Sequence, residues 1–317
     1  TVLHMFWSRD FIIGSVILLV LLLVYWFTMP KVITFEDAGL FLQVCQFKGL
    51  THPPGYPLFT ILCIPWFWLP ADPVILGNML SAIFGALTCV LVYFILRRLN
   101  VSLFSAAMAS LLFGLSRDFW SQAIIVEVYT LNTLLVSVAI YLALSFSIHP
   151  KRNYIFLLSF IFGLGISNHW PLVVLTTPGV LLISLFRWRE LAGILARPVN
   201  VFVCIILIAI GLMPYLYLVL NQDPGFSYSG SISTIREFRA YVMRDAFAGV
   251  DQSGSAGPMD KIHFVGWLLE RASIQFGLLF ALVTLAGMAR GLLIQRTLMT
   301  GLLVTFIGKP VVLLLLL

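Results

Sequence analysis

Long apolar runs dominate the chain, and several reach the roughly 17 to 25 residues that a helix needs to cross a bilayer. We predict membrane-spanning helices over residues 11–29, 75–96, 102–116, 130–148, 154–167, 171–186, 199–220, 272–289 and 298–317. The runs are continuous and do not alternate, which excludes a transmembrane β-barrel and favours helices whose backbone groups bond internally. The predicted fold class is an all-α polytopic transmembrane bundle.

A shorter apolar run over residues 56–69 contains Pro57 and Pro65. Proline breaks or bends a helix, so we predict a half-crossing or tilted helix here. The distinction matters for topology, because a full crossing at 56–69 would put Arg97 and Arg98 on the wrong side of the membrane.

Composition agrees with a membrane protein. Hydrophobic residues make up 61% of the chain, charged residues 10%, and the mean hydropathy is +1.03. No soluble fold of this length could bury so much apolar side chain. We expect an integral protein of a bacterial inner membrane, with residues 1–317 forming one transmembrane domain. A first outer loop is expected at 30–55 and a large one at 221–262, and a soluble domain is expected to follow the C-terminal run.

Basic residues recur after every second span and set the orientation by the positive-inside rule. The predicted cytoplasmic side carries Arg9, Arg97, Arg98, Lys151, Arg152, Arg187, Arg189, Arg197, Arg290 and Arg296. The net charge of +6 therefore reflects topology, and no nucleic-acid partner is expected. Polar residues gather on the other face, which suggests a site that opens to the periplasm or exterior. An inert solvated rim would give the same pattern.

The first outer loop begins with an acidic pair, Glu36 and Asp37. Thr34 and Asp37 have the spacing of a capping box, and the apolar positions that follow predict a short amphipathic helix along the membrane interface. The two carboxylates would then occupy its first turn. They either complement the helix dipole there or provide a general base beside low-dielectric lipid.

His52 opens the segment His-Pro-Pro-Gly-Tyr-Pro, in which three prolines and a glycine make a rigid turn. A lone histidine in a loop is usually just solvated. This one is held near the acidic helix and the head-group level, which makes it a candidate for binding substrate.

Further candidates lie at other helix ends on the outer face. Glu127 and Tyr129 begin a predicted helix, and Asn168 and His169 end another. Such groups line a pocket or simply extend their polar ends towards water.

A basic amphipathic helix is predicted in the large outer loop. Thr234 and Glu237 form a capping-box match, and Arg236, Arg239 and Arg244 follow on a broad polar face. The three arginines bind either a phosphate or the surface of anionic lipids.

The four cysteines, Cys45, Cys63, Cys89 and Cys204, show no paired spacing, so we expect neither a disulfide framework nor a zinc site. No phosphate-binding loop or dinucleotide motif is present, which argues against a nucleotide-sugar donor. Glu36 and Asp37 provide only two carboxylate ligands, fewer than a divalent metal ion usually binds. No metal ligands are therefore assigned, although a divalent metal cofactor is still possible.

Three segments together resemble the GT-C superfamily of polyprenyl-phosphate-sugar glycosyltransferases, and most closely its protein O-mannosyltransferase-related branch. They are the acidic loop followed by HPPG at 52–55, EVYTLN at 127–132 and GLGISNHWPL at 163–172. Asp37 and Gly39 match the Asp-x-Gly-Glu-Phe type motif of that branch. Leu40 stands where the motif has Glu, and Glu36 is the nearest other carboxylate.

The resemblance implies an outward-facing enzyme that moves a sugar from a polyprenyl-phosphate carrier to a hydroxyl of a protein, glycan or lipid. Asp37 would be the base, assisted by Glu36. Substrate would contact His52, Glu127, Tyr129, Asn168, His169, Arg236, Arg239 and Arg244, within a surround of membrane lipids. The alternative is a transporter or lipid flippase, for which polar residues near the bilayer midplane are expected.

Overall fold

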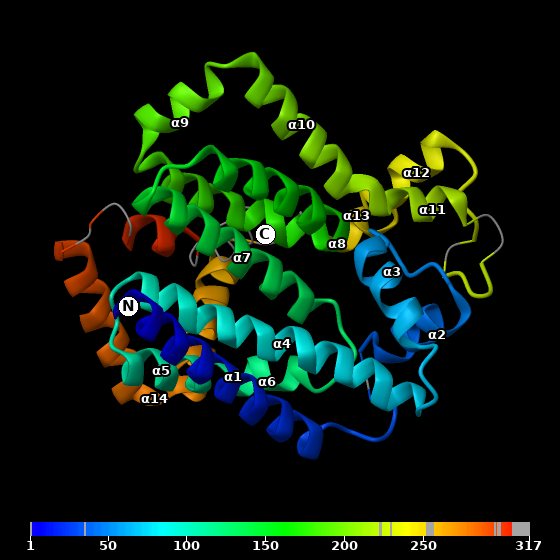
Figure 1. The fold of residues 1–317 in the computed structure, drawn as a ribbon. Coiled ribbons are helices and arrows are strands. Elements are labelled where there is room, and N and C mark those ends of the chain that lie inside the picture. The colour runs from blue at the N-terminus through cyan, green and yellow to red at the C-terminus, as the bar shows by residue number, and fades with distance from the viewer. Residues whose placement is uncertain are drawn as a thin grey trace.

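The computed structural model describes residues 2–34, 36–221, 224–228, 230–251, 257–294, 296 and 299–305. In this part of the chain the structure is helical (Figure 1). The α-helices are α1 (Val2–Thr28), α2 (Ala38–Phe47), α3 (Pro57–Trp66), α4 (Pro73–Arg98), α5 (Leu103–Gly114), α6 (Arg117–Ala123), α7 (Tyr129–Ile148), α8 (Arg152–Leu185), α9 (Trp188–Leu195), α10 (Pro198–Leu212), α11 (Leu216–Leu220), α12 (Ile235–Val242), α13 (Ala248–Asp251) and α14 (Pro258–Ile294). Short 3-10 helices, η1 (Met213–Tyr215) and η2 (Asp245–Phe247), join some of them.

Five described helical segments are long and apolar enough to cross a membrane, which confirms an all-α polytopic bundle. They are Arg9–Thr28, Pro73–Arg98, Tyr129–Ile148, Arg152–Leu185 and Pro198–Leu220. The predictions at 11–29, 75–96, 130–148 and 199–220 each fall on one of these segments. Apolar length alone was therefore enough to find them.

Helix α8 contains both of the spans predicted at 154–167 and 171–186, because the chain reverses inside it. His169 has non-helical backbone angles (φ −152°, ψ 82°). A Cβ placed on Gly165 would lie 2.9 Å from Cγ2 of Val173, whereas residues eight apart in a straight helix are separated by about 12 Å. Leu158 and Ile183 likewise share one hydrophobic cluster. The two limbs of α8 therefore run antiparallel, with His169 at the apex.

Of the four remaining predicted segments, one differs from the structure. The span predicted at 102–116 is wrong, since α5 has 12 residues, which is too few for a helix to cross a hydrocarbon core. Helix α3 has 10 residues, about 15 Å, so it is too short for a full crossing, as the half-crossing or tilted helix predicted for 56–69 requires. The span predicted at 272–289 lies within α14, which begins earlier and is broken at Gly277. Most of the span predicted at 298–317 lies outside the described residues.

Arg97 and Arg187, both predicted to be cytoplasmic, lie at one end of the bundle, here called the basic end. Arg97 Nε donates to Asp10 Oδ1 over 2.7 Å, which joins the end of α4 to the start of α1. Arg187 Nε donates to the carbonyl of Ser147 over 3.0 Å, which joins the ends of α8 and α7. Helices α2, α3, α11 and α12 lie at the opposite end (Figure 1), here called the site end. The half-crossing of α3 is what keeps Arg97 on the same end as Arg187.

Helices α8 and α10 touch backbone to backbone near the site end. A Cβ on Gly163 would lie 2.4 Å from the carbonyl oxygen of Ile208, and one on Gly211 would lie 2.6 Å from that of Phe160. Only glycine fits at either position, as is common where membrane helices cross closely.

Candidate active site

The acidic pair lies immediately before α2. Asp37 is the N-cap residue of this helix but makes no side-chain capping bond, and Glu36 has a left-handed backbone (φ 68°). The predicted capping box from Thr34 is therefore wrong, and neither carboxylate lies within the first turn. The reason is tertiary: the Asp37 carboxylate is directed to another partner, the imidazole of His52.

His52 bridges the acidic pair and the proline turn. Its Nε2 lies 2.9 Å from Asp37 Oδ2, and its Nδ1 lies 2.8 Å from the carbonyl oxygen of Pro53. Both ring nitrogens thus face oxygen acceptors, and the imidazolium is the form that donates to both. The His52 side chain is 14% exposed and that of Asp37 is 46% exposed, so one carboxylate edge remains open to solvent.

Aromatic rings surround the His52 side chain. The ring centroids of Tyr56, Tyr228 and Phe247 lie 5.3, 5.9 and 6.0 Å from that of the imidazole. Tyr56 also lies 5.4 Å from His169 at the apex of α8. These contacts bring the first loop, the large outer loop and α8 together around one histidine.

A disulfide joins Cys45 on α2 to Cys63 on α3. The prediction of no disulfide framework is wrong at this pair. The 18-residue separation gives no recognisable motif, and the two sulfurs meet only because α2 docks on α3. Closing a loop of this size stabilises a fold by about 3 kcal/mol in the chain-entropy account. The bond holds the helix that follows Asp37 against the helix that follows His52.

The proline turn is clamped by the large outer loop. Gly55 has φ 102°, and a Cβ there would lie 2.8 Å from Cε1 of Tyr241 and 3.0 Å from Cδ1 of Leu218. The Tyr241 hydroxyl donates to the carbonyl of Thr51. Glycine is needed at 55 both for its backbone angle and for this close approach.

Glu127 lies behind the acidic pair and is only 2% exposed. Its carboxylate accepts backbone N–H bonds from Val128 and Asp37. Burial, together with the negative charges of Asp37 and Glu36, raises the pKa of Glu127 to about 8. On α4, Ser81 accepts from the Glu127 N–H over 3.0 Å and donates to its carbonyl over 3.2 Å. Glu127 is thus a mainly neutral acid at pH 7 that holds the backbone of Asp37.

The other predicted residues of α7 and α8 lie next to this group. The rings of Tyr129 and His169 are 6.1 Å apart. Asn168 is buried and donates through Nδ2 to the carbonyl of Val128 over 3.3 Å, which fixes the apex of α8 against the start of α7. Trp170 donates to the carbonyl of Val242 over 2.8 Å, so the apex is also tied to α12.

The three arginines of the large outer loop lie in different surroundings. The capping box of Thr234 and Glu237 is formed as predicted, but α12 ends at Val242. Arg236 and Arg239 are exposed on α12. Arg244 lies beyond the helix end with φ 63°, is partly buried, and donates from Nη1 to the carbonyl of Pro53 over 3.3 Å. Its guanidinium lies 5.0 Å from the Phe247 ring centroid. Arg244 alone of the three reaches the His52 turn.

The donor set does not fit a divalent metal. Among the described residues, no group of three or more His, Cys, Asp or Glu side chains is placed to hold an ion. The groups placed near Asp37 are instead the imidazole of His52, which contacts it, and the guanidinium of Arg244, which contacts the Pro53 carbonyl of the same turn.

The sequence did not single out the aromatic residues Tyr228 and Phe247 or the hydroxyl of Ser81. Tyr228 lies in irregular loop and Phe247 ends the short 3-10 helix η2, so neither belongs to a segment long enough to show a periodic pattern. Ser81 had a signal, since a polar residue inside a membrane span usually has a partner or a role.

The amino-acid sequence of the chain matches one family model. Residues 37–192 match the family model described as the protein O-mannosyl-transferase TMEM260 N-terminal domain. The matched region begins at Asp37 and includes His52, Glu127 and His169. Over these residues the chain is similar to an O-mannosyltransferase-related family.

Two curated relatives carry the same family name. Protein O-mannosyl-transferase TMEM260 of Mus musculus is 29% identical over 235 residues, which cover 71% of this chain and 33% of the relative. Protein O-mannosyl-transferase tmem260 of Dictyostelium discoideum is 24% identical over 292 residues, covering 86% of this chain and 35% of the relative. The chain thus spans about a third of the length of either relative. No solved structure gave a significant match.

Proposed function

We propose that this chain is the membrane-embedded catalytic part of a glycosyltransferase that moves a sugar, mannose by analogy with its relatives, from a polyprenyl-phosphate carrier to a hydroxyl group. The relatives' names make a protein hydroxyl the preferred acceptor. The observation that carries the proposal is the Asp37–His52 pair beside Glu127 and Arg244, within a membrane bundle.

Asp37 is proposed as the general base. The acceptor oxygen attacks the anomeric carbon of the sugar, the bond from that carbon to the phosphate oxygen breaks, and the acceptor proton moves to Asp37. One carboxylate oxygen, Oδ2, is fixed by His52, which leaves the second oxygen for the acceptor. Glu127 fixes the backbone of Asp37 from the buried side. Glu36 adds negative charge but, on this proposal, is not the base.

Arg244 and His52 are proposed to stabilise the leaving polyprenyl phosphate. The departing group is already a phosphate, so it needs positive partners more than it needs a strong acid. Both side chains contact the Pro53 carbonyl and lie among aromatic rings, where a charge interaction is stronger than in water.

The deciding experiment is a transfer assay with purified protein, polyprenyl-phosphate mannose and hydroxyl-bearing acceptor peptides, read by mass spectrometry. Transfer of one hexose supports the proposal. Well-folded full-length protein that binds the donor but never transfers its sugar would contradict it and favour the transporter or flippase alternative. Against that alternative, a cavity between α7, α8, α9 and α10 is lined almost entirely by apolar side chains, whereas a transport path needs polar groups near the midplane.

Orientation gives a separate prediction. We infer that the site end faces the periplasm, exterior or lumen, because basic residues favour the cytoplasm and disulfides form in oxidising compartments. In intact cells, a membrane-impermeant maleimide should label Ile235→Cys, which is an exposed position at the site end, and should spare Lys151→Cys. The native cysteines give little background, since Cys45 and Cys63 are bonded and Cys89 and Cys204 are buried. The opposite labelling pattern would reject the orientation.

The arginines give a graded prediction for donor binding. Arg244→Gln should weaken binding of a polyprenyl-phosphate sugar by about 1.5 to 3 kcal/mol, the usual range for hydrogen bonds to charged groups. Arg236→Gln and Arg239→Gln remove the same charge from exposed positions and serve as matched controls, with little expected effect in neutral detergent. Equal losses in all three variants would assign the arginines to surface anchoring and leave the phosphate to other groups.

A further inference from the structure

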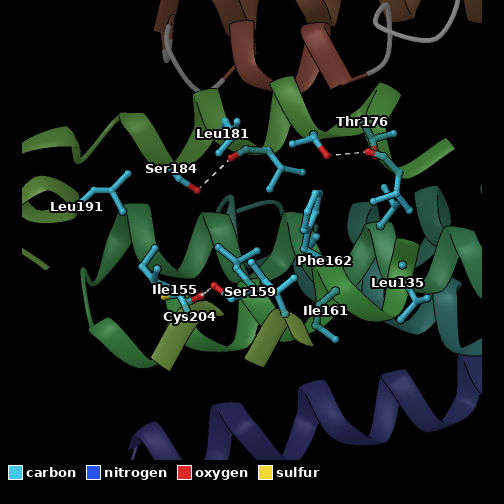
Figure 2. A pocket seen from close by; sticks show the side chains of 18 of the residues that line it. Leu135, Ile155, Ser159, Ile161, Phe162, Thr176, Leu181, Ser184, Leu191 and Cys204 are labelled. Carbon is cyan, nitrogen blue, oxygen red and sulfur yellow. Dashed lines mark hydrogen bonds between the residues drawn. The ribbon is translucent and has the colours of Figure 1, made fainter. Parts of the chain in front are cut away.

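A cavity of about 430 Å³ lies inside the bundle, between α7, both limbs of α8, α9 and α10 (Figure 2). Its lining is almost entirely apolar. The hydroxyl side chains in the wall, Ser159, Thr176, Thr177 and Ser184, each donate to a carbonyl of their own helix limb. These hydroxyl donors are therefore already used within the helices, and the cavity suits a hydrocarbon ligand.

The cavity runs along α8 away from the candidate active site. Gly165 and Val173 line it one to two turns from the apex at His169. Ile155 and Ser184 line it near the ends of the two limbs that are farthest from His169, and Leu191 of α9 lines the same part of the cavity. Its far part therefore lies at the basic end, opposite the residues proposed for sugar transfer.

Basic side chains lie next to this part of the cavity. Arg152 is three residues before Ile155 on the same limb, which places both on one helix face. Arg187 lies just beyond the end of α8, at the N-cap of α9, three residues after Ser184. Lys151, Arg189 and Arg197 are exposed nearby in the chain, and Glu190 is the one acidic residue between 149 and 198. Arg187 lies 3.5 Å from Glu190, while the other four have no carboxylate partner in the described part of the chain.

We propose that this cavity and its basic rim, defined as Lys151, Arg152, Arg187, Arg189 and Arg197, form a binding site for an anionic lipid. One hydrocarbon chain occupies the cavity and the phosphate lies against the rim. An apolar slot with positive charge at its membrane-interface end is complementary to such an amphiphile, and the exposed indole of Trp188 lies at the same level. This site is separate from the proposed transferase site and does not depend on its activity.

Two kinds of anionic lipid share this chemistry: a membrane phospholipid and a polyprenyl phosphate. Both can be offered to purified full-length protein in neutral detergent and detected by native mass spectrometry. Phosphatidylglycerol, polyprenyl phosphate and neutral phosphatidylcholine serve as the three probes. Preferential retention of phosphatidylglycerol identifies a phospholipid site, preferential retention of polyprenyl phosphate identifies a carrier site, and either supports the proposal.

Two variant pairs test the position of the site. Arg152→Gln with Arg189→Gln removes two rim charges, and Arg236→Gln with Arg239→Gln removes two exposed charges at the site end. Ala139→Phe fills the cavity from α7, and Ala109→Phe adds the same bulk to an exposed position on α5. We expect at least about 10-fold weaker retention of the anionic lipid in the first member of each pair and no change in the second.

Equal retention of phosphatidylcholine, no retention of either anionic lipid, or equal losses in a variant and its matched control would overturn the proposal. A thermal unfolding curve reports whether Ala139→Phe folds normally. If it does not, the rim variant decides the question by itself, because its two side chains are exposed.

Discussion

Replacing Asp37 by Asn is expected to lower sugar transfer by about 100-fold or more, the usual contribution of a general base. Asparagine keeps the size of the side chain and an oxygen that can accept from His52 Nε2, so fold and donor binding should persist. The loss should appear in turnover rather than in affinity. Initial rates with a polyprenyl-phosphate mannose donor, at saturating donor, measure it.

Glu36→Gln is the matched control, since it removes a neighbouring carboxylate that has a different backbone geometry and is not the base in the proposed mechanism. It should cost much less than Asp37→Asn. Wild-type turnover of the Asp37→Asn protein would retire Asp37 as the base, and a larger loss from Glu36→Gln would move the assignment to Glu36.

Glu127 is expected to tolerate Gln but not Ala. The Gln amide oxygen can still accept the backbone N–H groups of Val128 and Asp37, whereas Ala leaves both without this partner. A displacement of a catalytic group by about 1 Å can cost 100-fold in rate, so Glu127→Ala should fall by about that factor while Glu127→Gln stays near wild type at pH 7. Equal rates of sugar transfer for the two variants would show that Glu127 does not position Asp37.

The pH dependence of stability provides a second measurement on Glu127. Its pKa in the folded protein, about 8, lies above the ordinary value of 4.5, so the folded state retains a proton that the unfolded state has released. This contribution to stability is complete below about pH 4.5 and is lost as the pH rises through about 8. Thermal unfolding should therefore occur at lower temperature at about pH 9 than at about pH 6. Glu127→Gln, which cannot ionise, should reduce this difference, and an unchanged difference would show that the pH dependence arises from groups other than Glu127.

Features set by local sequence were predictable. Apolar length found the spans, and the capping box of Thr234 and Glu237 formed because both partners lie in one helix turn. The three prolines and the glycine after His52 predicted a rigid turn, and this turn holds His52 against Asp37. The reversal at His169 followed from the break between two apolar runs.

Features set by tertiary contact were not predictable from one sequence. Thr34 and Asp37 have capping-box spacing, but the contact with His52 takes the Asp37 carboxylate away from the helix end. Cys45 and Cys63 meet only because α2 docks on α3. Arg244 was predicted to share a helix face with Arg236, yet the helix ends at Val242, and Arg244 itself has a left-handed backbone and donates to the carbonyl of Pro53.

The glycine contact between α8 and α10 has a mechanical consequence. At Gly163 and Gly211 the two backbones already touch, so the helices cannot move closer there. If a ligand enters the cavity, α10 is expected to rotate as a rigid body about this contact. Such a swing displaces α9 and the basic end most and the site end least. Binding of a ligand in the cavity would therefore leave the positions of Asp37 and His52 nearly unchanged. Substitutions at the basic end and at the site end should then affect lipid binding and sugar transfer separately.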